Sequence, residues 1–112
     1  MSFEEIKHIV AEKIMCVIHE SHLPENQGFG GKVYIFHKIF TLILENLDII
    51  SRPGFESKGV IIHTIREKIK MWKEEVPIVM KSMNPQRVLS IRDKVLQTDA
   101  VVVILEKKLN IL

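Results

Sequence analysis

One short stretch of the sequence resembles a phosphate-binding loop in composition. It is the glycine-rich run from Gly28 to Lys32, and glycine backbones can approach an anion closely at the N-terminus of a helix. A P-loop, however, needs a glycine five residues before its Gly-Lys pair and a serine or threonine after it. Those two places hold Asn26 and Val33. We therefore interpret the run as a connection between two helices, and no nucleotide cofactor is expected.

A second stretch contains residue types that can bind a metal ion. His19 and His22 are three residues apart, with Glu20 and Glu25 nearby, so two imidazoles could point toward one ion. Two ligands do not make a metal site. The sequence has neither a His-Glu-x-x-His motif nor the paired Glu-x-x-His motifs of a di-iron helical bundle. We expect these residues to be solvated at the end of a helix, without a metal.

No nucleophile with a recognisable base can be identified among the serine, cysteine, histidine and carboxylate residues. The apolar residues follow patterns that commit them to helix packing, which leaves little room for a substrate cavity. We therefore expect that the protein is not an enzyme.

The elements that must position any functional side chain are helices, because apolar residues recur at helical spacing through almost the whole chain. Ser2 and Glu5 form a capping box, which predicts a helix that runs to about His19. Pro24 and several glycines then predict a loop over residues 23–31. A central helix is expected from Lys32 to Ile50.

The second half of the chain predicts further helices. The clearest is an amphipathic helix from Val60 to Val76, which Pro77 should end or kink. Asn84 and Pro85 are typical of the start of the next helix. The last element begins near Thr98, and its valine-rich core would suit a strand, but no second strand exists to pair with it. The sequence therefore predicts an all-α fold, a small up-and-down bundle of about five helices in one domain over residues 1–112.

The overall composition is that of a folded globular protein, with 46% apolar and 27% charged residues. The one cysteine, Cys16, cannot form an intrachain disulfide, which favours a reducing compartment, so we expect a cytoplasmic location. The longest apolar stretch, from Val33 to Ile50, is interrupted by His37, Lys38, Glu45 and Asp48. No membrane span is therefore expected.

Charge is unevenly distributed along the chain. Residues 1–50 have four lysines and seven acidic residues, whereas residues 51–112 have twelve basic and seven acidic residues. The two halves could neutralise one another by packing together, which we favour, or the basic half could bind nucleic acid. A helix-turn-helix reader is disfavoured, since its recognition helix would begin with the apolar run after Asp99.

Arg92 conflicts with the pattern around it, because helical spacing places it between Val88 and Val95 in the arc expected to face the core. Its long side chain could extend along the margin of the core to reach solvent. If it is buried, it must be paired, and Glu45 or Asp48 would be natural partners.

These observations predict a protein-protein interaction module, such as an adaptor, a regulator or an inhibitor of the immunity type, that acts through its helical surface. The partner would be another protein or a second copy in a homodimer, because the C-terminal helix is more apolar than one face of a bundle requires. The alternative is a nucleic-acid-associated regulator that uses the basic C-terminal half. The aromatic candidates could equally be residues that cap the core. The candidate partner-binding residues are Phe29, Phe55, Arg66, Lys70, Trp72 and Lys73.

Overall fold

A computed structural model describes residues 1–55 and 58–111. Over these residues the chain forms five α-helices and a short 3-10 helix, η1, and contains no strand. The predicted all-α bundle is confirmed. The elements in chain order are α1 (Phe3–Glu20), η1 (Pro24–Asn26), α2 (Phe29–Glu45), α3 (Leu47–Ile50), α4 (Lys58–Ser82) and α5 (Pro85–Leu109).

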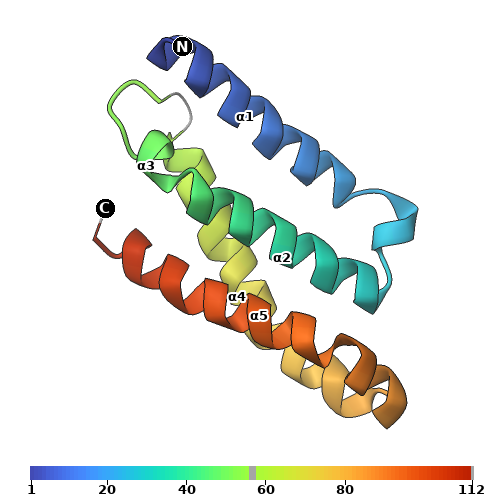
Figure 1. The fold of residues 1–112 in the computed structure, drawn as a ribbon. Helices are drawn as coiled ribbons and strands as arrows, with labels where there is room; N and C mark the ends of the chain where they lie inside the picture. Colours follow the sequence, from blue (N-terminus) through green and yellow to red (C-terminus); the bar gives the residue numbers. More distant parts are fainter. Residues whose placement is uncertain (56–57, 112) are drawn as a thin grey trace.

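Helix α2 is the central element of the bundle. Figure 1 shows α1 and α5 on either side of α2, while α4 crosses behind it. Helix α1 runs antiparallel to α2, whereas α5 runs in the same direction as α2 and packs against it more extensively than any other helix does. The wide apolar arc of α2 is explained by this position, because the helix must contact neighbours on several sides.

The central helix differs from its prediction at both ends. It begins at Phe29 instead of Lys32, and it is interrupted at Asn46 before α3 starts. The side-chain amide of Asn46 donates a hydrogen bond to the carbonyl of Leu42 at 2.8 Å. Asparagine side chains compete in this way with the backbone pattern of a helix.

Pro77 does not end α4, which continues to Ser82. Of the two expected effects of Pro77, an end or a kink, the end of the helix is therefore wrong. Pro77 is exposed, so the carbonyl that loses its backbone donor one turn earlier can be hydrated. Val76 is buried just before Pro77, and half-buried Met80 packs on the core after it, so the helix contacts the bundle on both sides of the proline.

The C-terminal part of the chain forms one helix of 25 residues, not two helices with a turn near Thr98. Its start is as predicted, because Asn84 Oδ1 accepts a hydrogen bond from the backbone N–H of Gln86 at 2.9 Å. Thr98 is fully buried, and its hydroxyl donates to the carbonyl of Lys94 at 2.7 Å. This bond one turn back satisfies the threonine inside the helix, so no turn is required there.

An aromatic cluster joins α2 and α4 at the centre of the core. The ring of Trp72 meets the rings of Phe36 and Phe40 edge to face, at centroid distances of 5.5 and 6.4 Å. This geometry is the favoured one for aromatic pairs. The indole Nε1 of Trp72 donates to Asp99 Oδ1 at 2.7 Å, so the polar edge of the ring is satisfied and also ties α4 to α5.

His37 forms a polar link between α2 and α5. Its Nδ1 lies 3.1 Å from the hydroxyl oxygen of Thr98. Because the Thr98 hydroxyl hydrogen is already directed at Lys94, His37 must donate through Nδ1–H. Burial, reinforced by the positive charge of Lys94, lowers the pKa of His37 below its ordinary value.

We expect this lowered pKa to make the protein less stable in acid. The unfolded chain binds a proton at His37 near pH 6.5, more readily than the folded protein does. The contribution of His37 to stability is therefore complete above that pH and is lost as the pH falls through the lower pKa of the folded state. The urea midpoint should decrease between pH 7.5 and pH 5.5, and the decrease should be larger for the wild type than for His37→Asn. The asparagine amide can still donate to Thr98. Equal shifts for the two proteins would contradict this assignment.

Candidate protein-binding site

The structure separates the six predicted site residues into core and surface. Trp72 is only 2% exposed and Phe55 only 5% exposed, so both are core residues that cannot contact a partner while the protein is folded. Phe29, the first residue of α2, is half-buried and packs against the core. The three aromatic candidates therefore stabilise the bundle, as the core-capping interpretation required.

The three basic candidates lie together on the surface. Arg66, Lys70 and Lys73 line a groove of about 390 Å³ between α4 and the C-terminal end of α5, together with Glu74 and Glu106. The Lys73 ammonium pairs with the Glu106 carboxylate at 2.6 Å. Arg66 Nη2 donates to the carbonyl of Leu109 at 3.2 Å, at the C-terminus of α5. Two of the three cations thus join α4 to α5, which weakens the case for a nucleic-acid surface here.

The glycine-rich run has a packing role at its last glycine. A Cβ atom on Gly31 would lie 2.8 Å from the Cα of Asn26, whereas Gly28 and Gly30 have no neighbouring atom within 4 Å of that position. Of these three positions only position 31 requires glycine, because the absence of a side chain there lets η1 pack directly against the first turn of α2. The run lies at the start of α2 and not in a loop before it.

Two further expectations from the sequence concern metal binding and membrane insertion. His19 and His22 are both exposed. Among the residues described, no three histidine, cysteine, aspartate or glutamate side chains are placed to hold a metal ion together. Across those same residues, no helix combines the length and apolar character that crossing a membrane requires.

A largely apolar groove lies between α1 and α4. Both helices pack against α2, but they make little contact with each other. They leave a groove of about 330 Å³, which we call the α1–α4 groove. It is lined by Ala11, Ile14, Met15 and Ile18 from α1 and by Val60, Ile61, Thr64 and Ile65 from α4.

The α1–α4 groove continues toward the C-terminal end of α1. A narrow cleft shares Ile14, Thr64 and other residues with it, and α2 supplies part of its lining through residues that include Ile39 and Leu42. A further hollow of about 210 Å³ shares Ile39 with this cleft. The linking cleft holds only about 10 Å³. On α4 the three hollows follow one another over residues 60–75, which is about 22 Å of helix.

The rims of the groove carry large apolar side chains that face solvent. Met15 on α1 is 65% exposed and Val60 on α4 is 67% exposed. Isolated exposed apolar residues are ordinary, but a lined apolar groove with exposed rims is typical of a binding surface. At the other end of the groove the lining is polar and charged, and includes His22, Lys32 and Lys68.

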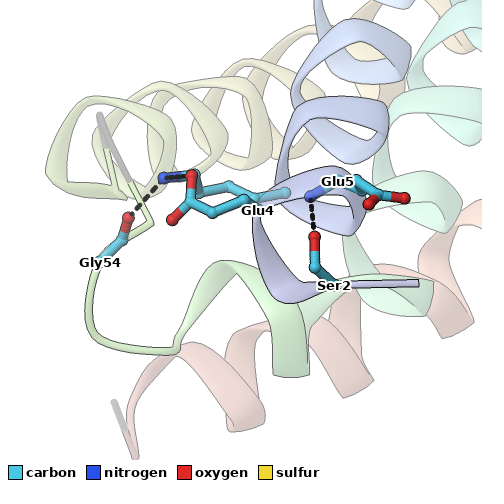
Figure 2. A network of polar contacts seen from close by, with 5 residues as sticks. Ser2, Glu4, Glu5 and Gly54 are labelled. Carbon is cyan, nitrogen blue, oxygen red and sulfur yellow. Dashed lines mark hydrogen bonds and ion pairs between the residues drawn. The ribbon is translucent and has the colours of Figure 1, made fainter.

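Polar contacts at both ends of α1 join it to neighbouring parts of the chain. At the start, Ser2 Oγ accepts from the backbone N–H of Glu5, and Lys7 Nζ donates to the carbonyl of Gly54 at 3.2 Å and pairs with Glu4 at 3.0 Å (Figure 2).

At the end of α1, the Glu20 carboxylate pairs with Lys38 of α2 at 2.8 Å. The hydrogen bond with Glu20 is the main reason that the pKa of Lys38 is raised. Asn26 Nδ2 also donates to the Glu20 carbonyl at 2.9 Å. The groove is thus already formed in the free protein, which lowers the ordering cost of binding.

Sequence reasoning missed the α1–α4 groove because it assigned the apolar stripes of both helices to the core. One feature of the sequence could have indicated the groove. Met15, which is exposed next to buried Ile14, makes the apolar face of α1 wider than one neighbouring helix can cover. Comparisons of the chain with protein-family models, with curated proteins and with solved structures found no match. The function is therefore inferred from the fold and the groove.

Proposed function

We propose that the protein is a protein-binding module that receives an amphipathic helix of its partner in the α1–α4 groove. The observation that carries this proposal is the apolar groove between α1 and α4, with Met15 and Val60 exposed at its rims. Two further hollows prolong it along α4 over residues 60–75, about 22 Å of helix. Grooves of this kind bind helices whose apolar side chains recur at three- and four-residue spacing. An adaptor, a regulator and an inhibitor can each act through such a surface.

The lining of the groove specifies the chemistry of the helix that it fits. Four helical turns, about 15 residues, match its length. Apolar side chains on one face would bury against the lining from Ala11 to Ile18 and from Val60 to Ile65. Lys32 and Lys68 lie at the polar end together with Glu75, so we infer that the partner helix has an acidic residue at that end.

Selection from a displayed library of helical peptides tests this function. We expect the selected peptides to share apolar residues at positions i, i+3, i+4 and i+7. Their affinity should fall about tenfold or more with Val60→Lys or Met15→Lys, because each variant places a charge where an apolar contact forms. Both side chains are largely exposed, so the stability of the variants should stay within about 0.5 kcal/mol of the wild type.

Leu89→Lys is the matched control, since Leu89 is 66% exposed on α5 and lies outside the groove. It should bind the selected peptides as the wild type does, as measured by fluorescence anisotropy. Peptides that bind all of these variants equally well would show that the groove is not the binding site.

A further inference from the structure

Helix α5 has a second apolar face that the bundle does not use. Leu89, Leu96 and Val103 are 66, 55 and 51% exposed, and they are spaced seven residues apart. At about 100° per residue they lie within an arc of about 40° on one side of the helix. Thr98 and Leu105, which are fully buried, lie on the opposite side.

Two more apolar residues extend this face. Ala100 and Ile104 are also exposed. Helical spacing places Ala100 one turn from both Leu96 and Val103, and places Ile104 one turn after Ala100 at the edge of this face. A surface helix normally carries polar residues on the face opposite the core. We call the five residues the α5 stripe: Leu89, Leu96, Ala100, Val103 and Ile104.

We propose that the α5 stripe pairs with the α5 stripe of a second copy, as an antiparallel helix pair centred on Leu96. Spacing by seven residues is the repeat by which two helices pack side by side over several turns. With a two-fold axis at Leu96, Leu89 lies opposite Val103 of the second copy. Leu96 then meets Leu96 of the second copy, so the three residues spaced by seven all meet apolar side chains, as a self-complementary interface requires.

The charges beside the stripe favour this arrangement. Arg92 and Asp99 are both exposed. Arg92 is four residues before Leu96, and Asp99 is three residues after it. In the antiparallel pair, Arg92 of one copy and Asp99 of the other therefore differ by only about 1.5 Å in height along the helix axis. The contact occurs twice per dimer. Asp99 accepts from Trp72 through Oδ1, and a carboxylate can accept further hydrogen bonds.

A parallel pair would have the opposite electrostatics. Asp93 and Lys107 are both exposed, and helical spacing places both within about 40° of the line through Leu89. In a parallel pair in register, each of them would face its own copy across the seam, and the two helix dipoles would also be aligned. In the antiparallel pair Lys107 does not face a like charge. Asp93 lies level with Asp99 of the second copy, but Arg92 lies one residue from the same level and attracts that carboxylate.

The register can be tested by disulfide formation in the full chain with Cys16, which is exposed, replaced by serine. Leu96→Cys should form a covalent dimer on mild oxidation, because residue 96 meets itself at the two-fold axis. Leu89→Cys or Val103→Cys alone should not, since these positions lie too far from their own copies for a disulfide. The double variant Leu89→Cys with Val103→Cys should form the dimer again. Efficient crosslinking of Leu89→Cys alone would establish a parallel pair and overturn the proposal.

Sedimentation equilibrium of the protein without added cysteines measures the association itself. A single helix-helix seam is a small interface, so we expect a dissociation constant on the order of micromolar. Leu96→Glu should weaken association about tenfold or more, because it buries a charge at the centre of the seam. Arg92→Glu should weaken it by a smaller factor.

Met15→Glu, on the α1–α4 groove, should leave association unchanged, so a failure of this proposal is distinguishable from a failure of the peptide-binding function. A wild-type protein that remains monomeric at millimolar concentration would refute the pairing. So would a dimer that is insensitive to Leu96→Glu.

Discussion

Replacement of Trp72 by alanine is expected to lower the free energy of unfolding by about 3–5 kcal/mol. Trp72 is the largest fully enclosed side chain of the core, and its ring contacts Phe36 and Phe40 edge to face. The substitution leaves a cavity between α2 and α4 and removes the hydrogen bond to Asp99. Since domains of this size have total stabilities of about 5–15 kcal/mol, much of the fold's stability depends on this residue.

Urea unfolding followed by circular dichroism at 222 nm measures this effect. Trp72→Phe is the matched control, because it keeps an aromatic ring against Phe36 and Phe40 but has no donor for Asp99. Its loss should be smaller than that of Trp72→Ala. A loss below about 1 kcal/mol for Trp72→Ala would mean that the ring is not at the centre of the core as described.

Gln97→Pro is expected to destabilise the protein by about 3 kcal/mol or more. Gln97 is exposed in the middle of α5, so the substitution removes little side-chain packing. Its cost arises in the backbone, because proline lacks the N–H that a continuous helix uses at this position and its ring clashes with the preceding turn. The same substitution in a turn near Thr98, which the sequence pattern suggested, would cost far less.

Gln97→Ala is the control for the loss of the glutamine side chain. It should be neutral or slightly stabilising, because alanine is the better helix former. Both variants can be compared with the wild type by thermal and urea unfolding. If Gln97→Pro unfolds with the midpoint of the wild type, α5 is interrupted at this position and the α5 stripe loses its regular spacing.

The two proposed surfaces lie on separate parts of the molecule. The α1–α4 groove is formed on the side of α2 where α1 lies, whereas α5 flanks α2 on the other side (Figure 1). A dimer through α5 would therefore leave both grooves open. If both proposals hold, a partner with two suitable helices would bind with a higher avidity than either helix alone provides.

Several elements could be predicted from local sequence signals. The capping box at Ser2 and the Asn84-Pro85 pair identified the starts of α1 and α5 correctly. These signals involve residues within one turn of each other, so they act before any tertiary contact forms. The same is true of the helical spacing in α4, whose buried residues Ile65, Ile69, Trp72 and Val76 all belong to the predicted apolar side.

The errors arose where a local preference competes with packing. Pro77 and Thr98 both disfavour an uninterrupted helix, yet α4 and α5 pass through them. Val95 and Val102 are buried on either side of Thr98, while buried Val76 and half-buried Met80 flank Pro77. These contacts hold both helices against the core, and that contribution is not contained in a window of a few residues. Asn46 shows the reverse case, because its side chain interrupts a helix that apolar spacing alone predicted to be continuous.

The sequence by itself determined that the chain is helical and where most of its helices begin, because those properties depend on contacts between residues three or four positions apart. Only the tertiary structure decided which apolar residues are buried. Trp72 and Phe55 are enclosed, whereas Met15, Val60 and Leu96 face solvent. The physical reason is that burial depends on which distant helix lies opposite a residue: α1 and α4 both pack on α2 and leave a groove between themselves, and α5 turns only one of its two apolar faces toward the core.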